Sequence, residues 1–313
     1  DRPLMTGGHD PQASGFTLQQ LELALGGTVD PYFRLDGAIV FSPAGVELEE
    51  AYATTLALPW NLQLRAGQFL SRFGRINGSH LHSWEFVDQT LVLGKFFGGD
   101  GNRVLGGELS LLLPLPWVVE LAASVGNATG AATARSFYGA DDLGVHGLQD
   151  LQTTLTAKQF FPLSDDWSLA LGLSAALGPN SSGPDQRTTI LGGDLFLKFR
   201  PASYGSYTQV ALQAEWLLRR RQTPGGLLQD QGLYSQLVYR FARRWSAAAR
   251  WELVTGLRAD PLDPAWRVPR QRTSANVTFY PTEFSRLRLQ YHFDSPGWQT
   301  AGHSVMLALE VSI

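Results

Sequence analysis

The stretch LPWNLQLRAGQFLSRFGRINGSHLHSWEFVDQTLV, which runs from Leu58 to Val92, contains the pattern that decides the fold. It begins with a tight turn that closes on Trp60. From Leu62 to Gly67, apolar residues alternate with polar residues or glycine. A period of two residues is what a β-strand needs to separate its two faces. A long polar loop follows, so the stretch predicts a strand between a short turn and a long loop.

Copies of this unit recur along the chain. A tryptophan follows a short turn in Leu115–Trp117, Asp165–Trp167 and Arg243–Trp245, and Phe284 takes the same place in a weaker copy. Because each aromatic stands where a strand leaves a short turn, we expect all of them at one height. At a membrane surface a tryptophan ring lies among the acyl chains and its N–H among the headgroups. The repeat predicts a membrane belt of Trp60, Trp117, Trp167 and Trp245.

The alternating pattern predicts an antiparallel all-β fold of about 15–16 strands. Fifteen segments read as strands, at about residues 16–27, 32–42, 46–57, 61–70, 103–114, 117–127, 149–161, 167–178, 188–200, 206–220, 229–241, 245–256, 272–280, 285–294 and 303–313. Many are ten or more residues long, close to the ~9–11 residues that a tilted strand needs to cross a bilayer. Strands of soluble sandwiches are usually shorter, ~5–6 residues.

The connections between these segments alternate in length. Short turns are expected near 28–31, 57–60, 114–116, 162–166, 201–205, 242–244 and 281–284. Longer polar connections are expected at 71–102, 127–148, 179–187, 221–228, 257–271 and 295–302, with only 42–45 short on that side. Short periplasmic turns at one end and long extracellular loops at the other are typical of transmembrane β-barrels.

The two faces of the strands support the same interpretation. Leu212, Leu289 and Leu307 lie on apolar faces, which we expect to contact lipid, while polar residues on the opposite faces line the lumen. The residues assigned to the pore are Arg34, Arg65, Glu108, Lys158, Gln213, Glu215, Arg240, Arg250, Arg286, Arg288 and Glu310. The inward charges of both signs are balanced, which predicts pairing across the wall. A soluble, lipocalin-like barrel with its tryptophans in the core is the alternative.

Composition narrows the classes further. The chain has 313 residues, of which 44% are hydrophobic and 17% charged, a balance shared by soluble proteins and transmembrane barrels because only alternate barrel residues face lipid. No window approaches the ~18 apolar residues of a transmembrane helix. The absence of cysteine excludes disulfide scaffolds and thiolate chemistry. A net charge of −3 gives no reason to expect nucleic acid as a partner.

The number of strands raises a problem of closure. With fifteen alternating strands, the first segment from Phe16 and the last segment to Ile313 run in the same direction, whereas such barrels normally have an even count. We expect a missing N-terminal strand, a partner chain or residues 1–15 to fill this seam, or else parallel pairing of the two strands. The Gly- and Pro-rich residues 1–15 are a poor strand, so a further segment or a partner is favoured. Residues 1–15 read as a tail or loop, residues 16–313 as the barrel, and 71–102 as a long extracellular or lumen-folded loop.

Four segments carry a family resemblance: Gly26–Arg34 (GGTVDPYFR), Glu49–Ala53 (EEAYA), Leu58–Phe69 (LPWNLQLRAGQF) and Phe73–Asp88 (FGRINGSHLHSWEFVD). They resemble proteobacterial outer-membrane proteins that are often labelled zinc-regulated outer-membrane receptors and that are distantly similar to the phosphate-selective porins. The resemblance covers the first third of the chain best and implies an outer-membrane β-barrel. A strand of the Asn-Pro-Asp-Ile type usually precedes the position of Gly15 in that family. This chain lacks it, which agrees with the odd strand count.

The long loop contains the sharpest candidate for site chemistry. His80 and His82 are two residues apart, and Glu85 and Asp88 follow as hard oxygen donors. Imidazole and carboxylate groups are ligands for Zn²⁺, so these residues form a tentative metal site. The alternative is that the loop folds into the lumen as a constriction, with His80, His82, Arg75 and Trp84 packing and hydrogen-bonding to the wall. A ligand-binding role for the loop is a third possibility. The sequence predicts no other cofactor.

Two other constellations are weaker. The run Arg219–Arg221, expected at the outer end of a strand, more often contacts lipopolysaccharide phosphates or is simply solvated than attracts anions as substrates. His146 and His292 lack a convincing nucleophile partner in sequence, so no enzymatic activity is expected.

Together these patterns predict a porin-like channel in the outer membrane of a Gram-negative bacterium, through which small solutes diffuse passively. Its partners are then the lipid bilayer, lipopolysaccharide and the solutes. A zinc-binding or zinc-uptake channel that uses His80 and His82 is one alternative. A structural barrel completed by a partner chain is the other.

Overall fold

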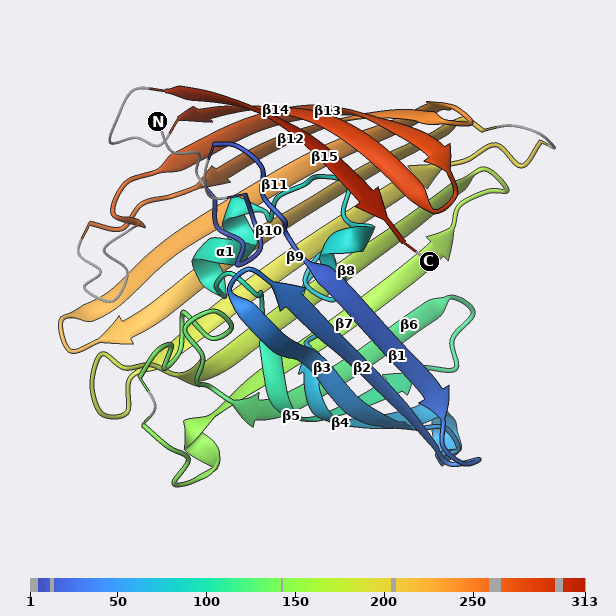
Figure 1. The fold of residues 1–313 in the computed structure, drawn as a ribbon. Coiled ribbons are helices and arrows are strands. Elements are labelled where there is room, and N and C mark those ends of the chain that lie inside the picture. The colour runs from blue at the N-terminus through green and yellow to red at the C-terminus, as the bar shows by residue number, and fades with distance from the viewer. Residues whose placement is uncertain are drawn as a thin grey trace.

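The computed structural model of the protein describes residues 5–11, 14–141, 143–203, 207–258, 266–295 and 301–312. Fifteen strands form one antiparallel sheet in which every strand pairs with its neighbours in the chain (Figure 1). The strands are β1 (Leu21–Thr28), β2 (Phe33–Ser42), β3 (Gly45–Thr55), β4 (Leu62–Leu70), β5 (Arg103–Leu112), β6 (Val118–Asn127), β7 (Leu151–Pro162), β8 (Trp167–Pro179), β9 (Arg187–Phe199), β10 (Gln209–Thr223), β11 (Gly226–Ala242), β12 (Trp245–Val254), β13 (Arg270–Thr282), β14 (Ser285–Ser295) and β15 (Gly302–Val311). The predicted strand number is confirmed.

Two predicted boundaries were wrong. The first strand begins at Leu21, because the side chain of Gln19 turns inward and donates to the carbonyls of His9 and Val87 at 3.3 and 3.0 Å. The predicted loop 221–228 is instead a tight hairpin: the β10–β11 ladder continues until Thr223 pairs with Gly226.

The sheet curls around a polar interior, so the usual distribution of side chains is inverted. Leu289 and Leu307 are 54% and 74% exposed on the outside, whereas Arg288, next to Leu289, is 3% exposed inside. Leu212 lies on the outer face of β10, next to the buried Gln213. This distribution is the one expected of a barrel whose outer surface contacts lipid.

The two rims of the barrel differ in their connections. At one rim, here called the short-turn rim, the connections run from each odd-numbered strand to the next, as in the turn 243–244 between β11 and β12. At the opposite rim lie the connections 71–102, 128–150 and 255–269, which are far longer. The prediction of sorted loops is thus confirmed, apart from the tight β10–β11 hairpin.

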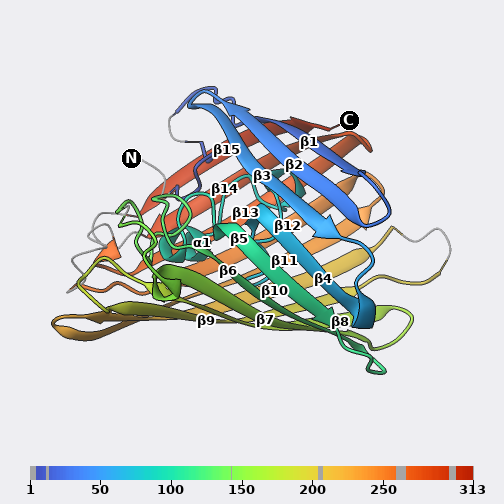
Figure 2. The same ribbon diagram turned by 90° about the horizontal axis from the view of Figure 1, so that it is seen from below.

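The connection 71–102, here called the lumen loop, folds back between the walls and carries the short helix α1 (Leu91–Phe96). Figures 1 and 2 show α1 within the curl of the sheet. The hydroxyl oxygen of Thr90 caps the helix by accepting from the N–H of Leu93 at 3.3 Å. The N-terminal segment packs beside the loop, with the N–H of Gly8 donating to the carbonyl of Gly99 at 3.0 Å.

The sheet does not close on itself. Within the described part of the chain, β1 and β15 each pair with one neighbour only, and no ladder joins them. Because the strands alternate in direction, β1 and β15 point the same way (Figure 1). Ile313, which was expected to end the last strand, lies outside the described residues.

No helix in the described ranges is long and apolar enough to cross a membrane.

Candidate functional site

The lumen loop closes off part of the interior through an apolar cluster. Leu91, Val92 and Phe96 from α1 and Phe73 from the start of the loop are almost fully buried. They pack against inward-facing wall residues and against the connections 128–150 and 255–269. These partners are Ala128, Ala134, Phe137, Ala176, Ile190, Leu217, Tyr234, Val254 and Trp266. The apolar residues of the otherwise polar inner face therefore form the surface against which the lumen loop packs.

Wall side chains also bind the backbone of the loop. Glu215 of β10 accepts from the N–H of Ile76 at 2.7 Å, and Glu252 of β12 accepts from the N–H of Leu91 at 2.8 Å. Buried N–H groups need such partners, since an unmet hydrogen bond there costs about 1–3 kcal/mol. Inward carboxylates that sequence reasoning assigned to the pore or to ion pairs thus serve partly as docking points for the loop.

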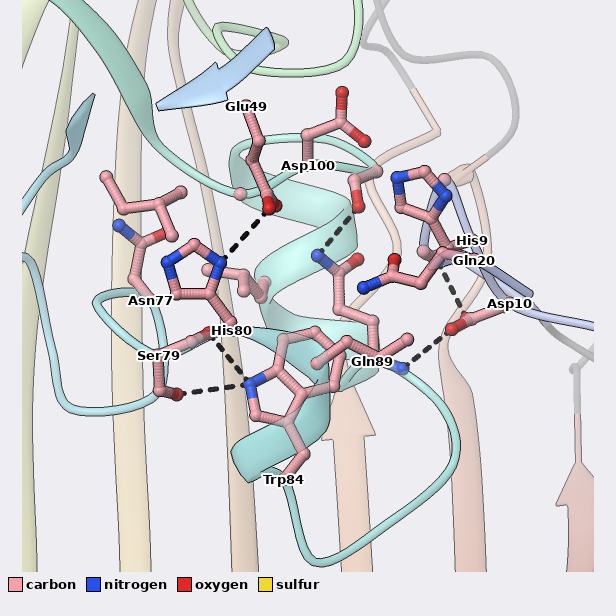
Figure 3. A pocket seen from close by; sticks show the side chains of 17 residues that line it. His9, Asp10, Gln20, Glu49, Asn77, Ser79, His80, Trp84, Gln89 and Asp100 are labelled. Atoms are coloured by element: carbon pink, nitrogen blue, oxygen red, sulfur yellow. Dashed lines mark hydrogen bonds and ion pairs between the residues drawn. The ribbon is translucent and has the colours of Figure 1, made fainter. Parts of the chain in front are cut away.

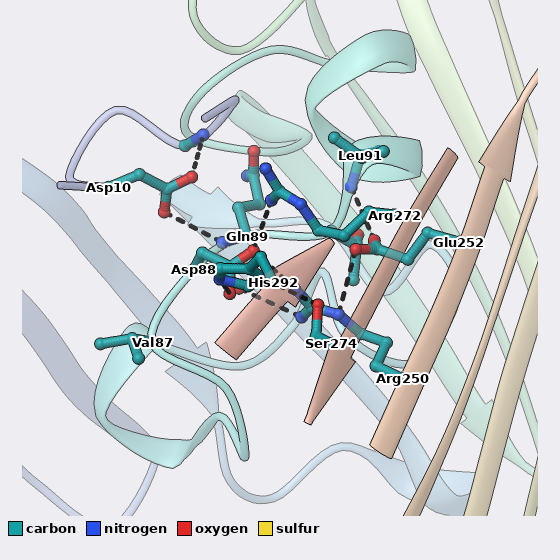
Figure 4. Close-up of polar contacts among 12 residues, drawn as sticks. Asp10, Val87, Asp88, Gln89, Leu91, Arg250, Glu252, Arg272, Ser274 and His292 are labelled. Carbon is teal, nitrogen blue, oxygen red and sulfur yellow. Dashed lines mark hydrogen bonds and ion pairs between the residues drawn. The ribbon is translucent and has the colours of Figure 1, made fainter. Parts of the chain in front are cut away.

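The strongest anchor of the loop is Asp88, which is completely buried (Figure 4). Its Oδ2 contacts the guanidinium groups of Arg250 at 2.6 Å and Arg272 at 2.7 Å, and its Oδ1 accepts from Gln290 at 2.7 Å. Burial alone would raise the pKa of Asp88, but Arg250, His292 and Arg272 together hold this pKa below its ordinary value. The carboxylate therefore stays ionised.

The same network contains an arrangement that resembles a catalytic triad. The Ser274 hydroxyl lies 2.7 Å from Nδ1 of His292, and Nε2 of His292 lies 3.5 Å from Oδ1 of Asp88. All three side chains are at most 1% exposed. A nucleophile must reach its substrate, which a buried hydroxyl does not. Ser274 therefore serves as a structural hydrogen-bond partner of His292. Sequence reasoning missed Ser274, because it lies on β13, the strand paired with that of His292.

A second polar cluster surrounds His80 (Figure 3). Its Nδ1 lies 3.0 Å from Glu49 and 3.4 Å from Glu22, and its Nε2 lies 2.9 Å from Glu50. The His82 ring stacks on it with a centroid distance of 5.7 Å, and His82 Nδ1 lies 3.1 Å from Glu22. The hydrogen bonds to Glu49 and Glu50 raise the pKa of His80 to about 10.

The structure thus rearranges the predicted metal set. His80 and His82 are neighbours, but Asp88 is enclosed by Arg250 and Arg272. The side chain of Glu85 lines a different cavity. Among the described residues, the donors that come together are His80 with Glu22 and Glu49. Glu22 and Glu49 come from β1 and β3, and sequence reasoning had assigned them only to balancing inward charges.

Five of the eleven residues assigned to the pore form ion pairs between strands of the wall. Arg65 pairs with Glu108 at 3.0 Å, Lys158 with Asp194 at 3.9 Å, and Arg286 with Glu310 at 2.5 Å. For these residues the expected pairing of inward charges across the wall is observed. The other six form different contacts. Arg34 and Arg250 form ion pairs with Asp36 and Asp88. The remaining four form hydrogen bonds: Gln213 with the Tyr234 hydroxyl, Glu215 with the N–H of Ile76, Arg240 with the Arg243 carbonyl and Arg288 with the Trp84 carbonyl.

The basic run Arg219–Arg221 does not form one outer cluster. Arg219 faces inward, is 1% exposed and binds Asp230 of β11 at 2.7 Å. Arg221 is also buried, and Arg220 between them faces outward. The period of two in a strand divides the run between two faces, so the expectation of a single anion-attracting patch was wrong.

The four belt tryptophans all stand at the short-turn rim, where even-numbered strands begin. Trp60 is 81% exposed, and Trp117, Trp167 and Trp245 are 40–42% exposed on the outside. Phenylalanines of the following strand extend the row, since Trp167 lies 4.9 Å from Phe199 and Trp245 lies 4.7 Å from Phe279 between ring centroids.

A cavity of about 400 Å³ lies between the lumen loop and the wall, toward the short-turn rim. Arg75 and Trp84 of the loop line it together with Lys158 and Gln236 of the wall. The guanidinium of Arg75 lies 3.6 Å above the ring centre of Phe196, which also lines the cavity. The space is therefore bounded by both charged and aromatic groups.

Comparison with known proteins agrees with this architecture. No family model matches the sequence. An uncharacterized protein of Aquifex aeolicus (strain VF5) is 35% identical over 91% of the chain, and the chain spans 65% of that relative's length.

Solved structures share the fold at low sequence identity. The outer membrane channel DcaP of Acinetobacter baumannii has a TM-score of 0.60 at 16% identity, covering 94% of this chain and 84% of its own. OprB of Pseudomonas putida has a TM-score of 0.58 at 11% identity, covering 93% and 86%. An anion-selective porin of Comamonas acidovorans has a TM-score of 0.53 at 10% identity, covering 93% and 87%. The fold is that of outer-membrane β-barrel porins.

Proposed function

We propose that the protein is a porin-like channel of the Gram-negative outer membrane, through which small solutes diffuse passively. The observation that carries the proposal is the inverted distribution of side chains around a lumen that a long loop enters. Leu289 and Leu307 are exposed outside, whereas Arg250 and Glu252 are buried inside. The likeness of the fold to solved channels supports the same function. The Ser274–His292 pair is buried and therefore gives no support to an enzymatic function.

Single-channel recording tests this proposal. Purified protein reconstituted in a planar lipid bilayer is expected to give discrete, voltage-independent conductance steps. Because the lumen loop fills part of the interior, these steps should be smaller than those of an open porin of similar strand number. A protein that inserts into the bilayer and passes no ions or small sugars would contradict the proposed function.

We also propose that one additional strand closes the barrel between β1 and β15, supplied by a further segment of the protein or by a partner chain. An open edge within lipid leaves a row of N–H and C=O groups without partners, and each costs several kcal/mol. One strand placed antiparallel to both edges satisfies them all, because β1 and β15 point the same way.

Engineered disulfides distinguish this closure from direct parallel pairing. The chain has no cysteine, so Leu25→Cys can be combined in turn with a cysteine at Val305, Leu307 or Leu309. Directly paired strands lie about 4.8 Å apart, whereas an intervening strand separates them beyond the ~7 Å limit of a disulfide. We expect no disulfide in membranes at any of the three registers.

The control pair is Leu23→Cys with Ile39→Cys, which lie opposite each other in the β1–β2 ladder and should cross-link. Efficient disulfide formation between β1 and β15 at any register would overturn the proposal of an additional strand.

A further inference from the structure

We propose that His80, Glu22 and Glu49 form a binding site for a divalent transition-metal cation, which joins the lumen loop to the barrel wall. One oxygen from each glutamate and a nitrogen of His80 lie within 4.8 Å of one another. Donor atoms around a tetrahedral Zn²⁺ lie roughly 3.3–3.5 Å apart, given metal–ligand distances of about 2.0–2.2 Å. Two of the distances, from Nδ1 to Glu49 at 3.0 Å and to Glu22 at 3.4 Å, are already close to this geometry.

The groups around these donors are arranged as the outer partners of a metal site. The second ring nitrogen of His80 bonds Glu50 at 2.9 Å, and the other oxygen of Glu50 accepts from the N–H of Leu70 at 2.6 Å. A carboxylate on the far nitrogen of a ligating histidine orients the ring and raises its basicity. Glu22 is held in the same way, because its second oxygen bonds Nδ1 of His82 at 3.1 Å.

The charge balance of the cluster favours a cation. The carboxylates of Glu22, Glu49 and Glu50 are only 10–16% exposed, and ring nitrogens of His80 and His82 lie against them. A divalent ion at the centre would balance the charge of these carboxylates. One nitrogen with two carboxylate oxygens suits Zn²⁺, Co²⁺ or Ni²⁺ better than Mg²⁺ or Ca²⁺, which prefer oxygen ligands alone.

A small cavity offers access to the site. It has a volume of about 40 Å³ and is lined by His80, Glu49 and Gln20 among others (Figure 3). A space of this size holds a water molecule, which can complete the coordination of an ion at the open side. The donors come from β1, β3 and the loop, and none of them contacts Asp88 or its partners Arg250, Arg272 and Gln290.

Binding of Co²⁺ and Zn²⁺ to the detergent-refolded protein, free of lipopolysaccharide, tests the proposal. Calorimetry should detect one equivalent of Zn²⁺, and Co²⁺ should give visible absorption bands typical of nitrogen and oxygen ligands. His80→Ala and Glu49→Gln should each weaken binding at least tenfold. Glu50→Gln, which changes only an outer partner, should weaken it by about 10–100-fold.

The matched control is His146→Ala, because His146 is an exposed histidine of the connection 128–150. It should leave both titrations unchanged. Each variant is first checked for the heat-dependent shift in gel mobility of a folded barrel. The conservative Glu22→Gln replaces a ligand variant, His80→Ala or Glu49→Gln, that fails this check. No saturable Zn²⁺ binding by the wild type, or equal binding by His80→Ala, would overturn the proposal, as would a preference for Mg²⁺. Conductance measurements test the channel separately.

Discussion

Replacing Phe73–Asp100 by a short Gly-Ser turn is expected to raise the single-channel conductance several-fold. These residues include α1 and the cluster that packs across the lumen. The ends of the loop already meet, since the N–H of Ser71 donates to the carbonyl of Asn102 at 2.9 Å, so a few residues can join β4 to β5. Removal of the loop takes this cluster out of the lumen, and conductance rises with the open cross-section.

This deletion also exposes apolar wall residues, such as Ile190 and Leu217, to water in the lumen. Folding is therefore verified by heat-dependent gel mobility before recording. The control replaces Pro224 by asparagine in the outer β10–β11 hairpin, which keeps a turn compatible with a hairpin and should leave the conductance unchanged. A folded deletion variant with wild-type conductance would show that solutes do not pass the loop.

Asp88→Ala is expected to lower the free energy of unfolding by about 3–5 kcal/mol, the usual result of removing one partner from a buried ion pair. The variant leaves the guanidinium groups of Arg250 and Arg272 facing each other without the carboxylate between them. It also removes the acceptor of Gln290. The loop should then detach from β12–β14, which would appear as conductance fluctuations between small and large levels.

Equilibrium unfolding in urea, followed by tryptophan fluorescence in lipid vesicles, measures the change. Glu85→Ala is the matched control, because it removes a carboxylate from the same loop outside the Asp88 network and should change stability by less than about 0.5 kcal/mol. Equal effects of the two substitutions would contradict an anchoring role for Asp88.

Some predictions from the sequence were right and others wrong, depending on how far along the chain the determining interactions reach. Alternation within a strand is local, so it predicted correctly that Leu307 lies outside and Arg288 inside. The hairpin at 224–225 was missed because the ion pair between Arg219 and Asp230 forms only when both strands are extended and paired. The short helix α1 was also missed. Its apolar face packs on walls that come much later in the chain.

The candidate site shows the same limit. His80 was recognised from its spacing to His82, but its carboxylate partners come from β1 and β3. Asp88 was selected as an oxygen donor for a metal, yet the fold places it between two arginines of β12 and β13. A sequence lists which side chains are able to bind a cation. The fold decides which charged group lies beside each of these side chains.

The sequence by itself determined the antiparallel barrel, its strand number, its outward and inward faces and the rim that carries Trp60, Trp117, Trp167 and Trp245. These features depend on a period of two and on turn lengths, which neighbouring residues set. Only the tertiary structure decided the path of the lumen loop, the partners of Asp88 and His80 and the unpaired edges of β1 and β15. They depend on which groups meet when the sheet curls, and in a low-dielectric interior each buried charge must lie next to an opposite one.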